Sequence, residues 1–254
     1  MNTQRRIFSL SFPALALSAA FFGAPAQAAW WGSGTGVTGS GNVQKQERAV
    51  SGFSRIHMGL SAEVEIRQGA NESVMVETDD NLQSLVETAV ENGTLKIRSA
   101  DKNRYPDTKN LKITVFLKNI DEVVLGGSGR IFSDKLDTPK LQLTIAGAGS
   151  MDVKSLQTSS LKVGIGGSGS FTAAGSAQQI VGNIGGSGNL RMEKLEAQDV
   201  NISIGGSGQV QTWAKERLQL SIGGSGNVSY YGDPKVTKSI GGSGSVRRLG
   251  AAPL

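Results

Sequence analysis

A four-residue glycine motif recurs through the second half of the chain at nearly constant spacing. Gly-Gly-Ser-Gly begins at six positions, and a degenerate copy, Ala146-Gly-Ala-Gly149, stands between the first two. Successive copies start 18 to 20 residues apart. A repeat of this length predicts a solenoid, because one repeat cannot bury its apolar face except against its neighbours. The expected turn glycines are Gly126, Gly127, Gly129, Gly166, Gly167, Gly169, Gly185, Gly186, Gly188, Gly205, Gly206, Gly208, Gly223, Gly224, Gly226, Gly241, Gly242 and Gly244.

Apolar and polar residues alternate on both sides of each motif. The run Val200-Asn-Ile202-Ser-Ile204 precedes Gly205, and Val210 follows Gly208. Alternation with a period of two residues is typical of a strand with one buried face. A flexible linker, the other interpretation of Gly-Ser-rich sequence, has no reason to keep a period. We therefore predict an all-β solenoid with coils of about 20 residues.

Glycine has two expected roles in these turns. It adopts positive-φ conformations at low cost, and it lets successive coils approach to about 4.8 Å without side-chain conflict. The serine of each motif is expected to stack on its equivalents as a ladder of hydrogen-bonded hydroxyls. These serines are Ser128, Ser168, Ser187, Ser207, Ser225 and Ser243.

Aligning the coils gives outward columns of side chains. One column is small and uncharged, and it predicts a flat polar strip suited to another chain or a glycan; an ordinary solvated β face is the alternative. It consists of Thr144, Gly164, Asn183, Ser203, Ser221 and Ser239. A second column is mixed in charge: Phe132, Asp152, Thr172, Arg191, Gln211, Ser229 and Arg247. Sugar rings could stack on Phe132, Phe171, Trp213, Tyr230 or Tyr231, although Phe132 and Phe171 fit a core equally well.

The sequence predicts no catalytic, cofactor-binding or metal-ligating residues. His57 is the only histidine and there is no cysteine, so a transition-metal or thiolate site is not expected. The calcium-binding RTX repeat shares Gly-Gly-x-Gly but needs Asp where this chain has Val210. A carbohydrate-active β-helix enzyme, the alternative function, needs acids converging from adjacent coils. Here Asp152, Asp199 and Asp233 fall in different columns.

The first 28 residues have the features of a signal peptide. Arg5-Arg6 is a basic start, residues 7–23 are apolar and uncharged, and Ala26-Gln-Ala28 fits a cleavage site before Ala29. No later stretch reaches the length of about 20 apolar residues that a membrane-spanning helix needs.

Without Arg5 and Arg6, 24 of the 26 basic residues remain against 21 acidic ones. The resulting net charge of +3 is too small to indicate nucleic-acid binding. The further expected boundaries are a Gly/Ser-rich segment at 29–43, a strand-rich half at 44–120, repeats at 121–247 and a tail at 248–254.

Residues 44–118 are rich in strands but do not repeat visibly. Strands are expected at 55–58, 63–67, 74–77, 94–98 and 111–117. Asn92-Gly93 predicts a tight hairpin turn. One helical turn is expected at 79–85, with Asp79 or Asp80 as its cap.

These residues carry a resemblance to a known family. Arg48-Ala-Val-Ser-Gly-Phe-Ser-Arg-Ile56, Ala62-Glu-Val-Glu-Ile-Arg-Gln-Gly69 and Asn92-Gly-Thr-Leu-Lys-Ile97, followed by serial Gly-Gly-Ser-Gly turns, resemble the autotransporter adhesin head GIN domain over about residues 43–247. The resemblance implies a right-handed parallel β-helix-like fold in an exported bacterial protein, and it supplies no catalytic residues. We expect a non-enzymatic envelope or cell-surface binding module of a Gram-negative bacterium, periplasmic, surface-bound or secreted. Its expected partners are an envelope glycan, a protein, or a second copy docked through a flat face.

Overall fold

The computed structural model describes residues 34–253, in which every regular element except one short 3₁₀ helix is a strand. The predicted signal peptide and its cleavage site at Ala28 and Ala29 lie outside the described residues. No helix in the described part of the chain is long and apolar enough to cross a bilayer. The elements are β1 (Thr35–Thr38), β2 (Val43–Arg48), β3 (Arg55–Met58), β4 (Glu63–Gln68), β5 (Ser73–Asp79), the 3₁₀ helix η1 (Asp80–Leu85), β6 (Val86–Glu91), β7 (Thr94–Ser99), β8 (Arg104–Asp107), β9 (Lys112–Leu117), β10 (Glu122–Leu125), β11 (Arg130–Ser133), β12 (Leu136–Ile145), β13 (Ser150–Ile165), β14 (Ser170–Ile184), β15 (Asn189–Ile204), β16 (Gln209–Ile222), β17 (Asn227–Tyr231), β18 (Lys235–Ile240) and β19 (Ser245–Gly250).

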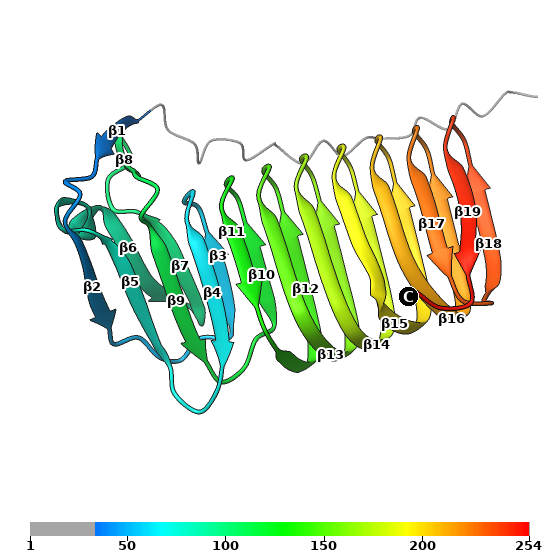
Figure 1. Ribbon diagram of the computed structural model, residues 1–254, viewed down its shortest axis with the longest axis horizontal. Helices are drawn as coiled ribbons and strands as arrows, with labels where there is room; N and C mark the ends of the chain where they lie inside the picture. The colour runs from blue at the N-terminus through cyan, green and yellow to red at the C-terminus, as the bar shows by residue number, and fades with distance from the viewer. Residues whose placement is uncertain (1–33, 254) are drawn as a thin grey trace, which may run out of the picture. The chain divides into compact units, whose positions relative to one another are not determined.

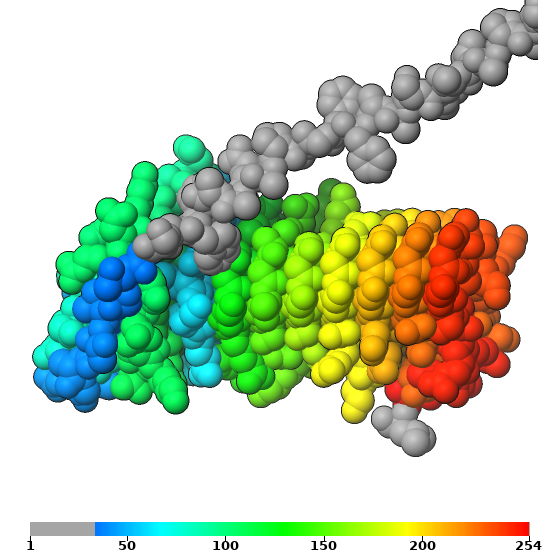
Figure 2. All heavy atoms as spheres, turned by 90° about the horizontal axis from the view of Figure 1, so that it is seen from above, coloured from blue at the N-terminus to red at the C-terminus, as the bar shows by residue number. Residues whose placement is uncertain are grey.

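Strands from β10 to β19 stack as parallel coils (Figure 1). Each of the long strands β13 to β16 starts after one glycine turn, bends around the core, and ends at the next turn. Figure 2, seen from above, shows the coils as successive rows in chain order from β12 onward. The predicted β-solenoid is therefore confirmed.

The alternating residues form the expected core columns. Ile165, Ile184, Ile204 and Ile222 are register partners on successive strands, and each is at most 2% exposed. Ser203, the residue before Ile204, is exposed. Burial of an isoleucine side chain contributes about 1.5–3 kcal/mol, so these columns are the main source of stability. The buried apolar residues other than Leu82 and Leu85 form one cluster that runs from Phe53 to Val228.

The N-terminal coils do not follow chain order. β3 pairs with β7 on one side and with β10 on the other, and β4 likewise lies between β9 and β11. In Figure 1 the cyan coil of β3 and β4 accordingly stands between two green ones. The expected strands of this half are all present. The sequence did not show that the first coil would be enclosed by two later ones.

Antiparallel strands close the N-terminal end of the core. β5 pairs with β9, β2 pairs with β5, and β6 pairs with β7. The predicted hairpin turn at Asn92-Gly93 joins β6 to β7, with φ of 51° and 74° at these two residues. Helix η1 adds the buried Leu82 and Leu85. Arg48 donates hydrogen bonds to the carbonyl oxygens of Gln83 and Val86, which ties β2 to η1 and β6.

Candidate functional site

The glycine turns stack so closely that two of the four motif positions have no room for a Cβ atom. At the second position, a Cβ on Gly167 would lie 2.3 Å from the carbonyl oxygen of Gly147. At the fourth, a Cβ on Gly169 would lie 2.4 Å from Cγ2 of Ile145. At the first position, a Cβ on Gly166 would meet nothing within 4 Å. The degenerate copy is consistent with this: it has Ala146 and Ala148, and it keeps glycine at the second and fourth positions.

Close approach, not positive φ, is the reason for glycine in these turns. Among the described residues, positive φ at glycine occurs only at Gly41, Gly52, Gly93, Gly175 and Gly232, so that part of the prediction is wrong. The expected hydroxyl ladder is also wrong. No hydrogen bond joins the motif serines through their hydroxyls in residues 34–253. Instead the backbone N–H groups of Ser187, Ser207 and Ser225 donate to the preceding coil, as Ser207 does to Gly186 at 3.0 Å.

The predicted uncharged column is in register on the face of β12 to β18. Thr144, Gly164, Asn183, Ser203 and Ser221 are successive partners, and Ser239 follows on β18. From Asn183 onward the members are exposed. Strands in register at about 4.8 Å spacing with short side chains give a flat surface. We call this column the polar strip.

Several charged side chains on the coils pair with opposite charges on the next coil. Arg217 donates to Asp199 at 2.6 Å, and Lys215 lies 3.1 Å from Glu196. Arg130 lies 2.9 Å from Asp152, and its guanidinium also stacks 5.9 Å from the ring centre of Phe132. No cluster of three or more acidic or histidine side chains that could hold a metal ion occurs within residues 34–253. Asp152, Glu196 and Asp199 thus serve as partners of cations on neighbouring coils, whereas Oε2 of Glu193 is buried without a hydrogen-bond partner within residues 34–253.

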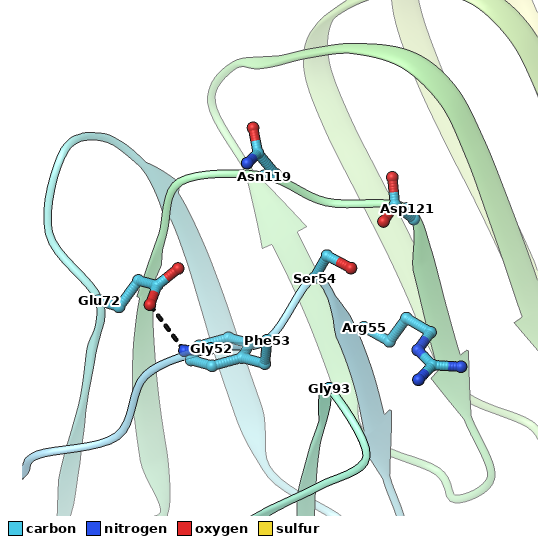
Figure 3. Close-up of a pocket in the computed structure, with 8 residues that line it drawn as sticks. All are labelled: Gly52, Phe53, Ser54, Arg55, Glu72, Gly93, Asn119 and Asp121. Carbon is cyan, nitrogen blue, oxygen red and sulfur yellow. Dashed lines mark hydrogen bonds between the residues drawn. The ribbon is translucent and has the colours of Figure 1, made fainter.

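A polar hollow of 540 Å³ opens beside the start of β3 and β10 (Figure 3). Glu72 points at Gly52 and accepts a 2.8 Å hydrogen bond from its N–H. Arg55 donates to the carbonyl oxygen of Asn92. Asn119 and Asp121 line it from the segment between β9 and β10. Sequence patterns do not indicate this hollow, because its residues come from four separate segments.

A second hollow, of 360 Å³, is lined in part by Asp79, which is 1% exposed. Its carboxylate accepts a 2.7 Å hydrogen bond from the Thr108 hydroxyl and a 2.8 Å bond from the Gly41 N–H. These hydrogen bonds, that from Thr108 first, lower the pKa of Asp79 below its ordinary value of 3.8. Asp79 occupies the N-cap position of η1, as predicted, but its side chain makes no capping hydrogen bond. The carboxylate instead fixes the segment that enters β2.

The candidate stacking aromatics divide into two groups. Phe171 is fully buried in the core, and Tyr230 occupies the inward column after Thr212. Phe132, Trp213 and Tyr231 occupy outward positions and are partly exposed. Trp213 and Tyr231 are register partners on β16 and β17.

His57, the only histidine, lies on β3 and is partly exposed. Its Nε2 is 2.7 Å from Oε1 of Glu122 on the neighbouring β10. This pair bridges two adjacent strands like the other charged pairs of the surface. It is consistent with a structural role.

Solved structures of bacterial proteins share this fold. A protein described as a putative adhesin from Bacteroides fragilis is 25% identical, with a TM-score of 0.80 over 84% of this chain and 100% of that chain. A putative lipid binding protein from Parabacteroides distasonis is 26% identical, with a TM-score of 0.70 over 85% of this chain and 100% of that one. A putative adhesin from Parabacteroides merdae, 22% identical with a TM-score of 0.66 over 84% of this chain and 98% of its own, shows the fold alone. No curated protein sequence matches this chain.

The family described as "Putative auto-transporter adhesin, head GIN domain" matches residues 33–234, from the segment before β1 to the start of the last coil. The match confirms the resemblance that the N-terminal strands and the glycine turns carry. The chain therefore belongs to the head GIN domain family.

Proposed function

We propose that this protein is a non-enzymatic binding module that acts outside the cytoplasm, in the periplasm or at the cell surface of a Gram-negative bacterium. The observation that carries the proposal is the polar strip, which runs in register over successive coils without a charged side chain. A rigid scaffold with such a surface offers contact area at little cost in conformational entropy. Membership of a family described as adhesins supports the same function.

The proposal includes export of the chain. Residues 1–28 are the signal peptide, and cleavage between Ala28 and Ala29 releases the binding module. The Gly/Ser-rich segment 29–43 then leads into the strand-rich half at 44–120 and the repeats at 121–247.

Ion pairing of the solenoid acids favours a binder over the alternative, a carbohydrate-active β-helix enzyme. A general acid or nucleophile must be free to exchange a proton or attack a substrate. Asp199 and Glu196 are instead held by Arg217 and Lys215 of the next coil. They contribute modest surface ion pairs, in the range of about 0–1 kcal/mol each.

The test is direct binding of the exported protein to immobilised polysaccharides and proteins, with an assay for released reducing ends in parallel. We expect retention on at least one surface and no release of sugar. Ser203→Arg with Ser221→Arg should weaken retention through the polar strip about tenfold, because two long cations would stand on a flat surface. Gln211→Arg is the control, since its column already contains Arg191 and Arg247. Turnover of any polysaccharide would favour the enzyme instead.

A further inference from the structure

Trp213 on β16 and Tyr231 on β17 lie side by side on neighbouring coils, and we propose that they form an oligosaccharide-binding ledge. The inference rests on the binding function proposed above and names its ligand class. Thr212 and Ala214, on either side of Trp213, are buried, so the alternation of the strand turns the Trp213 ring outward. Both rings are partly exposed. We call this pair the aromatic ledge; Figure 1 shows its strands near the C-terminal end of the solenoid.

The strand register changes beside the ledge. Met192 pairs with Thr212, and the next pair is Glu196 with Trp213, so residues 193–195 of β15 have no partner on β16. Of these three residues Leu195 is fully buried and Lys194 is exposed. The coil that starts at Gly205 has 18 residues and the one before it has 20, so Trp213 follows directly after Thr212 while Glu196 is its partner on β15.

On the other side of the ledge the next coil has a glycine and therefore adds no side chain beside Tyr231. The register partner of Tyr231 on the next coil is Gly250. A Cβ atom there would already lie 3.8 Å from Cδ1 and Cε1 of Tyr231, so any larger side chain would cover the ring. Gly232, with φ of 101°, similarly lies beside Trp213: a Cβ on it would be 3.5 Å from Cδ1 of the indole.

The rim of the ledge has the hydrogen-bonding groups that sugar hydroxyls require. Glu196 precedes Trp213 in the column and lies 3.1 Å from Lys215. Asp233, two residues after Tyr231, has a side chain 93% exposed and lies 3.4 Å from Arg248. The carboxylates accept hydrogen bonds and the cations donate them. A sugar hydroxyl, which is both a donor and an acceptor, can therefore bond to either kind of group.

The charge and shape of the aromatic ledge indicate the class of ligand that it binds. The two acids and two bases of the rim pair with each other, so the ledge has no net charge to attract a polyanion such as nucleic acid. A sugar ring combines an apolar C–H face with a rim of hydroxyls, which matches aromatic rings bordered by polar groups. Because the two rings follow one another along the coil axis, they can contact successive units of a chain. A neutral oligosaccharide fits these features best.

The test is isothermal titration calorimetry of the exported protein with cellohexaose, chitohexaose and mannohexaose. We expect binding of at least one of them. Trp213→Ala and Tyr231→Ala should each weaken it by about tenfold or more, as truncation of an aromatic anchor does. Trp213→Phe, which keeps a ring, should stay within about threefold of the parent protein. Tyr105→Ala is the matched control, because Tyr105 is a 46% exposed aromatic residue on β8.

A second measurement needs no change at the ledge. In a protein with Trp30→Phe and Trp31→Phe, Trp213 is the only tryptophan, and the bound sugar should shield its fluorescence from acrylamide. Unchanged affinity of both alanine variants, or no binding of any of the three sugars, would overturn the aromatic ledge. If proteins or other polysaccharides are still retained in that case, the proposed binding function stands; if nothing is retained, that function fails as well.

Discussion

Gly206 lies directly over Gly186, so closely that a Cβ atom on Gly206 would sit 2.1 Å from the Gly186 carbonyl oxygen. That oxygen cannot easily move away, because it accepts a 3.0 Å hydrogen bond from the N–H of Ser207. The same relationship joins Gly224 to Gly206 and Gly242 to Gly224. The lack of a side chain at these glycines therefore allows the hydrogen bonds between coils, and both features recur along the solenoid.

Substitutions at two adjacent glycines test whether close packing between coils, and not glycine content as such, stabilises the turns. Gly206→Ala should destabilise the protein by about 2–3 kcal/mol, because the new methyl group overlaps a fixed carbonyl. Gly205→Ala should be neutral or stabilising by up to about 1 kcal/mol, because the nearest atom to its Cβ is 3.9 Å away and alanine restricts the unfolded chain. Urea unfolding of both variants against the parent measures the difference. Equal losses would show that the turns are not packed as described.

The repeats were predictable because each coil repeats the same constraint. A glycine without room for a side chain and an alternating strand recur at nearly constant spacing, so the register of Ile204 with its equivalents could be deduced from sequence alone. The uncharged column containing Ser203 followed from the same alignment. The aromatic ledge did not, because the unpaired residues 193–195 appear only when the strands are set in register.

The sequence did not reveal β3 and β4 as a coil of the stack, and the reason is physical. Its turn between β3 and β4 is Gly59-Leu-Ser-Ala62, with a buried leucine where later turns need glycine. The coil beneath it, formed by β7 and β9, has a long connection containing β8 in place of a tight turn. No stacked turn therefore excludes a side chain at Leu60 or Ala62. The turn above does need glycine: a Cβ on Gly129 would lie 2.6 Å from the Ala62 carbonyl oxygen.

Acid should weaken the N-terminal end of the protein through Asp79. Its pKa is lowered in the folded state, so its contribution to stability is present above the ordinary value of 3.8 and disappears as the pH falls through the lower, folded-state pKa. Thr108→Val removes the principal hydrogen bond. We expect this variant to melt below the parent at pH 7, and the two melting temperatures to converge as the pH falls below about 4. A constant difference at every pH would assign the effect of Thr108 to packing alone.

Export can be tested by the mass of the processed chain. The Ala26-Gln-Ala28 motif predicts cleavage before Ala29, so mass spectrometry of the protein from the cell envelope should find an N-terminus at Ala29. Ala28→Leu should impair processing, because the cleavage site requires a small residue at this position. The control is Ala20→Leu, which makes the same change within the apolar run and should leave cleavage unaffected. A mature protein that retains Arg5 and Arg6 would contradict the proposed route.

Chelation should have no effect on stability. The glycine turns present no carboxylate at the position where calcium-binding repeats have Asp, and the coils pack through backbone hydrogen bonds such as that from Gly205 to Ile184, 2.8 Å long. The thermal midpoint should therefore be the same with EDTA and with added calcium. A midpoint that falls on chelation and recovers with calcium would show that a metal ion holds part of the fold.

Substitutions at Ile204 and Ser203 test whether the alternation encodes a buried face. Ile204 is 1% exposed between Ile184 and Ile222, and its Cγ2 would lie 2.6 Å from a Cβ on Gly226, so it is enclosed by both neighbouring coils. Ile204→Asp places a carboxylate there without a partner and should destabilise the protein by about 3 kcal/mol or more. Ser203→Asp adds the same group one residue away, on the solvent side, and should cost less than about 1 kcal/mol. Denaturant unfolding of the two variants compares the same chemical change on opposite faces of one strand, and equal stabilities would contradict the core described above.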